Sequence, residues 1–182
     1  FDGNKHSLTY YRTDSAASAI SLASLDSLAI ESYRVLHLSG ISLGMSPGAC
    51  DVGLELIRRA KLAGSMVSFD VNYRKAQWES PQAASACFSK ALALGVNILE
   101  ITDDEMKALA WGDCLSDVEH RFPMVETIAL KRGAAGAELV SNGQRISHPA
   151  FPVSVVDTVG AGDSFDAGFL TQIVEGQVLS EA

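Results

Sequence analysis

Short apolar runs alternate with amphipathic segments along most of the chain. Apolar stretches of strand length predict buried strands at Val35–Ser39, Met66–Val71, Val96–Leu99 and Val125–Leu130. Helical spacing of apolar residues predicts helices at Pro47–Ala63, Pro81–Leu94 and Asp103–Ala110. Strands that alternate with helices through short links are typical of a parallel sheet with helices packed on its faces.

The pattern differs on both flanks of this alternating region. Upstream, the sequence predicts a strand at Leu8–Arg12 and a short helix around Leu25–Glu31. Downstream, it predicts a hairpin from Ala137–Val140 and Arg145–His148, because the Asn142-Gly143 pair between them suits a type I′ turn. One further strand is expected at Phe151–Val156, and a helix from about Asp163 to Val174.

Composition narrows the class of protein. The 182 residues suit one domain, and 14 basic against 22 acidic residues give a net charge of −8. This balance argues against nucleic-acid binding, which needs a basic face for phosphates. With 47% hydrophobic residues the chain is not disordered, and it has no run of the roughly 18 apolar residues that a membrane helix needs.

The cysteines and histidines show no metal-binding pattern. Cys50, Cys87 and Cys114 are odd in number and far apart, so we expect small, buried, unpaired residues in a reducing, cytoplasmic setting. Structural or surface roles are expected for His6, His37, His120 and His148. There is no P-loop, and no order of Ser, His and Asp that indicates a hydrolase triad.

The most informative segment is the glycine-rich stretch from Asp157 to Phe169. A glycine-rich turn that opens a helix exposes backbone N–H groups at the positive end of the helix dipole, and such a turn binds anions. Asp163 would repel an anion there. It is therefore either an N-cap of the helix, or a base that accepts a proton from a hydroxyl group attacking phosphorus.

Three further segments follow predicted strands, where open α/β sheets bind ligands. They are Asp70–Arg74, Thr102–Glu105 and Lys131–Gly136. Lys131 and Arg132 could meet phosphate charge or could simply be solvated, and the acidic residues around Glu105 could form a solvated helix face.

The stretch from Asp157 to Phe169 resembles the second signature of the ribokinase-like (PfkB-type) carbohydrate kinases, DTxGAGDxFxAGF. The resemblance implies that the backbone of Gly160, Ala161 and Gly162 forms the anion hole for the transferred phosphoryl group. It also implies that Asp163 is the catalytic base, that Asp163 contacts the sugar, and that Thr158 lies at the nucleotide.

The segment from Lys131 to Gly136 is similar to the K-x-G-x-x-G element of the family. This similarity implies a nucleotide-binding role for Lys131, Arg132, Gly133 and Gly136.

A third element resembles the form found in 2-keto-3-deoxygluconate kinases. Asn72 and Arg74 match the Asn and Arg of its D-x-N-x-R pattern, which implies that Asn72 lies near the ATP phosphates and that Arg74 contacts the sugar acid. Tyr10 and Arg12 match a Y-Y-R element on the lid strand that touches substrate. Two arginines favour an acidic sugar, since a neutral one needs no second positive charge.

Glu105 matches the Glu of the family's N-x-x-E element, which organises Mg²⁺ through water. Thr102 stands where the family has Asn, so the match is incomplete.

Taken together, the resemblance implies an α/β, ribokinase-like three-layer sandwich with a mostly parallel sheet. Residues 1–14 would be a remnant of the β lid and residues 15–182 the kinase core. ATP and Mg²⁺ are the implied cofactors, 2-keto-3-deoxygluconate is the expected substrate, and homo-oligomers are possible. The alternatives are a neutral sugar such as fructose or ribose, another ketoacid sugar, or an inactive nucleotide-binding remnant.

The chain resembles an internal fragment, since the first and last parts of a full family member have no counterpart in it. We therefore expect it to be inactive and poorly soluble when it is made alone.

Overall fold

The computed structural model describes residue 11 and residues 14–176, and it contains a six-stranded sheet in the order β1-β2-β3-β4-β5-β6. The strands are β1 (Val35–Ser39), β2 (Met66–Asp70), β3 (Ile98–Thr102), β4 (Thr127–Lys131), β5 (Ala137–Ser141) and β6 (Gln144–His148). Strands β1 to β4 are parallel, whereas β5 and β6 join as an antiparallel hairpin. The mostly parallel sheet predicted from the sequence is therefore confirmed.

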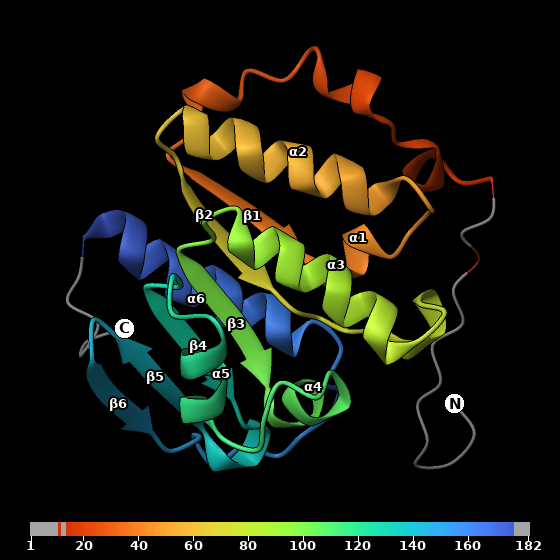
Figure 1. Cartoon of the computed structure of the whole chain (residues 1–182). Coiled ribbons are helices and arrows are strands. Elements are labelled where there is room, and N and C mark those ends of the chain that lie inside the picture. Colours follow the sequence, from red (N-terminus) through yellow and green to blue (C-terminus); the bar gives the residue numbers. More distant parts are fainter. Residues whose placement is uncertain (1–10, 12–13, 177–182) are drawn as a thin grey trace.

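Helices cover both faces of the sheet (Figure 1). They are α1 (Gly40–Leu43), α2 (Ala49–Leu62), α3 (Pro81–Ala93), α4 (Asp103–Ala108), α5 (Leu115–Arg121) and α6 (Ala161–Glu175). Because the parallel strands follow one another in order, right-handed crossovers place α2 and α3 on the same face. Helix α6 comes after the hairpin and packs on the opposite face, which completes three layers.

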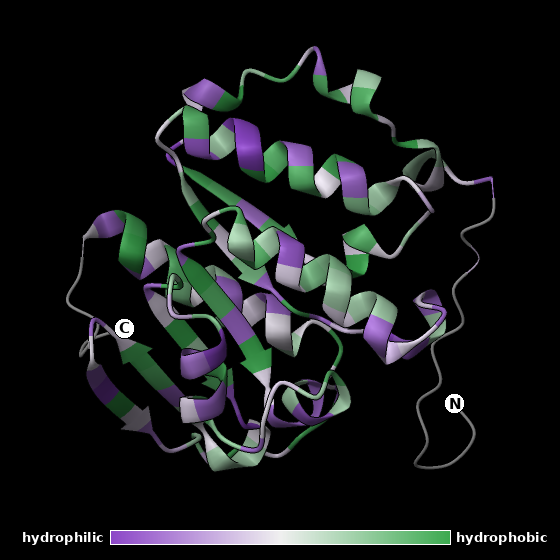
Figure 2. Cartoon of the chain, viewed as in Figure 1, coloured by the Kyte–Doolittle hydropathy of each residue, from purple (hydrophilic) through white to green (hydrophobic). Residues whose placement is uncertain are grey.

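The two faces of the sheet differ in chemistry. On β2, Val67 and Phe69 are fully buried in the apolar core beneath α2 and α3. Ser68 and Asp70 point the other way, because side chains alternate along a strand. Figure 2 shows the largely apolar strands between the helix layers. The face under α6 has a smaller apolar cluster around Phe169 and, beside it, the polar groups described below.

The structure bears out several local predictions. Ser80 caps α3 by accepting a hydrogen bond from the Ala83 N–H at 3.1 Å, with Pro81 in the first turn. In the hairpin turn, Asn142 and Gly143 have φ values of 50° and 77°, as a type I′ turn requires. The helices predicted at Pro47–Ala63, Pro81–Leu94 and Asp103–Ala110 and from about Asp163 to Val174 exist, with their ends shifted by a few residues.

Other expectations are wrong. Phe151–Val156 forms no strand: the apolar alternation is present, but no neighbouring strand pairs with it, and Phe151 and Val153 are exposed. The helix expected at Leu25–Glu31 is replaced by two 3₁₀ turns, Leu22–Leu25 and Ile30–Ser32. Helices α1 and α5 escape prediction, because α1 is a single turn and the two buried residues of α5, Leu115 and Val118, do not define a period. The strand expected at Leu8–Arg12 lies outside the described residues, except for Tyr11. Tyr11 is not part of a strand.

The expectation for the cysteines is also wrong. Cys50 and Cys87 form a disulfide between α2 and α3, and Cys114 is exposed rather than buried. The spacing does not reveal this pair, because the two residues are 37 positions apart and meet only where the two helices lie side by side.

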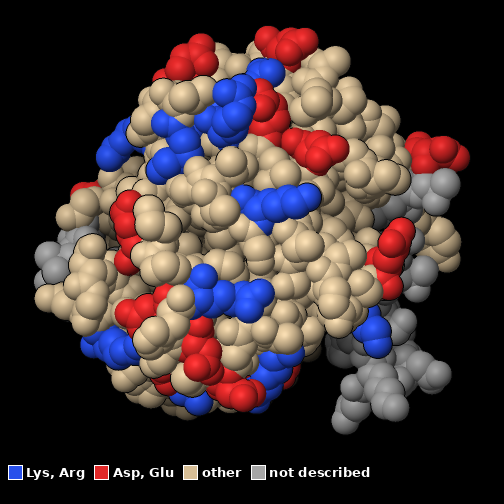
Figure 3. All heavy atoms as spheres, viewed as in Figure 1, with Lys and Arg blue, Asp and Glu red and all other residues tan. Residues whose placement is uncertain are grey.

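Within the described residues, no helix is long and apolar enough to cross a membrane. On the face shown in Figure 3, basic and acidic side chains are interspersed. On α2, for instance, Glu55 pairs with both Arg58 and Arg59.

Candidate active site at the carboxyl edge of the sheet

The parallel strands end at one edge of the sheet, and the first turn of α6 lies against it. Lys131, the last residue of β4, bonds Asp166 in the second turn of α6. At the other end of the helix, Arg34 donates a hydrogen bond to the Val174 carbonyl at 3.1 Å. Helix α6 therefore runs antiparallel to the strands, and its N-terminus is held at the edge where α/β folds bind ligands.

The glycine-rich turn leaves backbone donors free at this end of α6. Gly160 is the N-cap, with a φ of 76° that favours glycine, and the Ala161 N–H donates to the Thr158 carbonyl. Within the described part of the chain, the N–H groups of Gly162 and Asp163 have no partner. The Gly160 N–H has none either, and unpaired N–H groups at a helix N-terminus attract anions.

The Asp163 side chain does not cap the helix, because the N-cap position belongs to Gly160. Its carboxylate is exposed, and no hydrogen bond or ion pair joins it to any residue that the structure describes. Of the two interpretations from the sequence, the N-cap is wrong. An unengaged carboxylate next to free backbone donors remains available to accept a proton.

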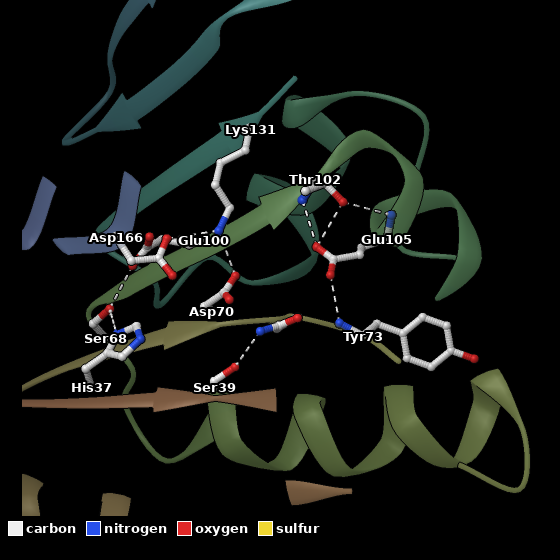
Figure 4. A network of polar contacts seen from close by, with 11 residues as sticks. His37, Ser39, Ser68, Asp70, Tyr73, Glu100, Thr102, Glu105, Lys131 and Asp166 are labelled. Atoms are coloured by element: carbon white, nitrogen blue, oxygen red, sulfur yellow. Dashed lines mark hydrogen bonds and ion pairs between the residues drawn. The ribbon is translucent and has the colours of Figure 1, made fainter. Parts of the chain in front are cut away.

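Lys131 is the centre of a buried network of charges (Figure 4). Its Nζ lies 2.8 Å from Asp70 Oδ1 and 2.9 Å from Asp166 Oδ1. Burial lowers the pKa of Lys131, but the two carboxylates outweigh it and the net shift is upward. Burial also raises the pKa of Asp70 to about 6, against the opposing effect of Lys131.

A second carboxyl group completes the network. Glu100 on β3 is fully buried and accepts a hydrogen bond from Ser68 at 3.0 Å. Its Oε2 and the Oδ2 of Asp166 are buried without a hydrogen-bond donor. Burial first, and then the hydrogen bond and charge of Asp166, raise the pKa of Glu100 to about 9. At neutral pH Glu100 therefore carries a proton, and it can donate that proton to Asp166.

The loop after β2 carries the next two predicted site residues. The Asn72 side chain donates to Ser39 Oγ at 3.0 Å, which joins the ends of β1 and β2. Arg74 is exposed, and its guanidinium has no partner among the described residues. A free guanidinium two residues from Asn72 can bind a carboxylate or phosphate through two hydrogen bonds.

Glu105 holds that loop in place. Its Oε1 accepts the Tyr73 N–H at 2.7 Å, while its Oε2 accepts both the N–H and the hydroxyl of Thr102. Thr102 and Glu105 thus form a capping box at the start of α4, a pattern that the sequence already contained.

This engagement limits how Glu105 could serve a metal ion. In the described residues, no group of three His, Cys, Asp or Glu side chains is placed to hold one. Both carboxylate oxygens of Glu105 already accept hydrogen bonds from the protein, so its expected contact with Mg²⁺ through water stays a prediction.

The Lys131–Gly136 segment is held by the fold itself. Arg132 pairs with Asp103 and Glu138. A Cβ at Gly136 would lie 2.0 Å from the His148 carbonyl oxygen, so glycine is needed for the close approach of the hairpin. Gly133 has a φ of 53°, and a Cβ placed there would meet no atom within 4 Å, so this glycine faces open space.

The structure thus brings together most of the predicted residues at one edge, from the β2 loop, the end of β4 and the start of α6. Tyr10 and Arg12 lie outside the described residues. Sequence reasoning missed the two buried acids of the network, Glu100 and Asp166. One signal was available, because a charged residue in the middle of an apolar strand, as Glu100 is, needs a buried partner.

Replacing Glu100 by Gln should stabilise the protein, and increasingly so as the pH rises. The folded pKa of about 9 lies above the ordinary value of 4.5. The stability tied to this proton is therefore complete below about pH 4.5 and is lost as the pH rises towards 9. The neutral amide avoids that loss, so we expect a Tm several degrees higher than wild type at pH 8 and a smaller difference at pH 5.

Thermal unfolding followed by circular dichroism at both pH values measures this difference. Glu79→Gln, the same change at an exposed site, should leave the Tm unchanged at either pH. A Tm for Glu100→Gln below wild type at pH 8 would mean that Glu100 is ionised in the fold.

The fold defines an α/β protein in which the N-terminus of α6, with unpaired N–H groups and an exposed carboxylate beside them, lies at the carboxyl edge of the parallel strands. The pfkB family carbohydrate kinase pattern matches residues 2–182, and the chain belongs to this family.

Two of the relatives that resemble the chain are named for different kinds of sugar. A 2-dehydro-3-deoxygalactonokinase of Haloferax volcanii is 30% identical over 93% of the chain and 55% of its own length. A fructokinase of Klebsiella pneumoniae is 35% identical over 74% of the chain and 44% of its own length. The chain therefore spans about half the length of these curated relatives.

A solved structure shares the architecture. Fructokinase with bound ATP from Xylella fastidiosa matches 95% of the chain and 54% of its own, with a TM-score of 0.82 at 22% identity. This likeness confirms the three-layer fold.

Proposed function

We propose that the protein containing this chain is an ATP-dependent sugar kinase that phosphorylates a hydroxyl group of a sugar acid, with 2-keto-3-deoxygluconate as the expected substrate. The observation that carries the proposal is the first turn of α6, where the exposed Asp163 carboxylate lies beside the unpaired N–H groups of Gly162 and Asp163.

In the proposed reaction, Asp163 takes the proton of the sugar hydroxyl as its oxygen attacks the γ-phosphorus of ATP. The new oxygen–phosphorus bond forms while the bond to the β-phosphate oxygen breaks and ADP leaves. The backbone N–H groups of Gly160 and Gly162 stabilise the charge on the phosphoryl oxygens, and the Ala161 N–H joins them once it leaves the Thr158 carbonyl. Glu105 would hold Mg²⁺ through water, and the ion would supply positive charge to neutralise the nucleotide phosphates.

The nucleotide lies, in this proposal, along the ends of β2 and β4 and the start of α6. The residues that line this path are the predicted nucleotide-binding residues Asn72, Arg132, Gly133, Gly136 and Thr158. Arg132 must then exchange Asp103 or Glu138 for phosphate. The sequence also assigns Lys131 to the nucleotide, but its ammonium group already has two carboxylate partners.

The sugar acid binds, in this proposal, beside the nucleotide, where its carboxylate meets Arg74. The exposed, unpaired guanidinium supports this assignment. Tyr10 and Arg12, on the proposed lid remnant of residues 1–14, would contact the same ligand. The similarity to a sugar-acid kinase favours this substrate class. The similarity to a fructokinase favours the second candidate, a neutral sugar.

A substrate panel separates the two candidates. The product of the complete open reading frame is assayed for ADP release with ATP and, in turn, 2-keto-3-deoxygluconate, 2-keto-3-deoxygalactonate, fructose and ribose. We expect kcat/KM to be at least tenfold higher for the acids than for the neutral sugars. A preference for fructose or ribose contradicts the acidic substrate, and ATP binding without sugar-dependent ADP release contradicts a kinase.

A further inference from the structure

We propose that Lys131 is a positioning residue: through Asp166 it sets the place of the first turn of α6, and so of Asp163. This inference rests on the proposed function. It gives Lys131 a role different from contact with the nucleotide.

The contacts of Lys131 reach both the sheet and the helix. Its ammonium joins Asp70 at the end of β2 to Asp166 on α6, and the side chains of both acids are about 95% buried. Asp166 lies three residues after Asp163, within one turn of the same helix. A displacement of Asp166 therefore moves the Asp163 backbone with it.

The ammonium also lies directly under the turn that carries the free N–H groups. A Cβ at Gly162 would be 3.7 Å from Lys131 Nζ, and the centre of the Phe165 ring is 5.8 Å from it. Figure 4 shows the lysine reaching from β4 toward Asp70 and the helix. The position of this one group thus determines how close the start of α6 approaches the sheet.

Few other contacts of α6 could fix the position of its first turn on the sheet. Among its described residues, only Asp166 and Phe169 are buried. Phe169 packs against Ile98 and Ala129. Because apolar contacts are not directional, they fix the distance of α6 from the sheet better than its orientation. The hydrogen bond from Arg34 holds the far end of the helix. In the described structure, the directional contacts nearest to Asp163 are therefore those of the Asp166 side chain, with Lys131 at 2.9 Å and with the protonated Glu100.

The positioning role and nucleotide contact predict different kinetics. A lysine that binds phosphate would have to give up a buried carboxylate, and its loss would raise the KM for ATP. A lysine that positions α6 affects the geometry of transfer, so its loss lowers kcat. Small misplacements of a catalytic group can cost about 100-fold.

The test compares Lys131→Met, Asp166→Leu and the double variant in the product of the complete open reading frame. We expect each single variant to lower kcat about 10–100-fold with the KM for ATP within about threefold of wild type. Both substitutions break the same ion pair, between Lys131 and Asp166. The kcat of the double variant should therefore be no lower than that of the slower single variant. Asp166→Asn keeps an acceptor for Lys131 and should recover part of the loss.

Ser68→Ala is the matched control. It removes a buried hydrogen bond of the same network, to Glu100, but Ser68 makes no contact with α6 among those described. A general weakening of the network would lower kcat here too, whereas the positioning role predicts an unchanged kcat.

Amide hydrogen exchange provides a readout that needs no activity. In Asp166→Leu, residues 160–170 should exchange at least tenfold faster than in wild type, while β2 and β3 exchange at the wild-type rate; Ser68→Ala should not show this. If the wild type proves inactive on every sugar, the proposed function fails and the exchange result alone decides the positioning role.

Two outcomes overturn the inference. One is a tenfold or larger rise in the KM for ATP in Lys131→Met with normal kinetics in Asp166→Leu, which would place Lys131 at the nucleotide. The other is unchanged exchange of residues 160–170 in Asp166→Leu. That variant leaves Lys131 paired with Asp70, so the experiment remains decisive if Lys131→Met fails to fold.

Discussion

Asp163→Asn is expected to lower kcat of the complete protein by about 10²–10⁴-fold, the usual cost of losing a general base. The amide has nearly the same size as the carboxylate but does not accept the hydroxyl proton. The Asp163 side chain has no partner among the described residues, so its replacement breaks no contact that holds this part of the fold. ATP binding, measured by isothermal titration, should stay within about threefold of wild type.

The control for this prediction is Asp113→Asn, which makes the same change in charge on the loop before α5. It should leave kcat unchanged. Near wild-type turnover of Asp163→Asn on the preferred sugar would show that another group takes the proton.

Arg74→Ala is expected to raise the KM for the sugar acid about 10–100-fold, because a hydrogen bond to a charged group contributes about 1.5–3 kcal/mol. The KM for ATP should change little. Initial rates at saturating ATP and varied sugar measure the effect. Arg74→Lys should recover only part of it, since lysine keeps the charge but not the two-point geometry.

Lys75→Ala removes the neighbouring exposed cation and should leave the KM for the sugar unchanged. If a neutral sugar is the better substrate and Arg74→Ala does not alter its KM, the assignment of Arg74 to a sugar carboxylate is wrong.

The elements with a strong sequence period were predictable. The buried strands β1 to β4 are nearly continuous apolar runs, and α2 and α3 have helical spacing with clear ends. Helices α1 and α5 were not predictable, because α1 is a single turn and the two buried residues of α5 do not define a period. The strand prediction for Phe151–Val156 failed for the opposite reason. The segment has the alternation of a strand, but a strand also needs a neighbour to pair with, and the local sequence does not specify one.

The site was predictable where one continuous motif carried it, as in the turn from Thr158 to Asp163. It was not predictable where residues far apart in sequence meet. The Lys131–Asp70 pair spans 61 positions, and the Cys50–Cys87 disulfide spans 37. The sequence correctly predicted that Lys131 lies at the carboxyl edge of the sheet, at the end of β4. Its choice of partner depends on how α6 packs, which the residues around Lys131 do not determine.

The late place of α6 in the chain has a consequence for the order of folding. Strands β1 to β4 and the helices on their other face can assemble from contacts between successive elements, which form quickly because they are local. Helix α6 must then return across the opposite face to strands that lie well before it in the sequence, with the β5–β6 hairpin between them. Until it docks, Asp70, Glu100 and Lys131 remain hydrated. We therefore expect the sheet to form first and the glycine-rich turn at the start of α6 to take its place in the last step of folding.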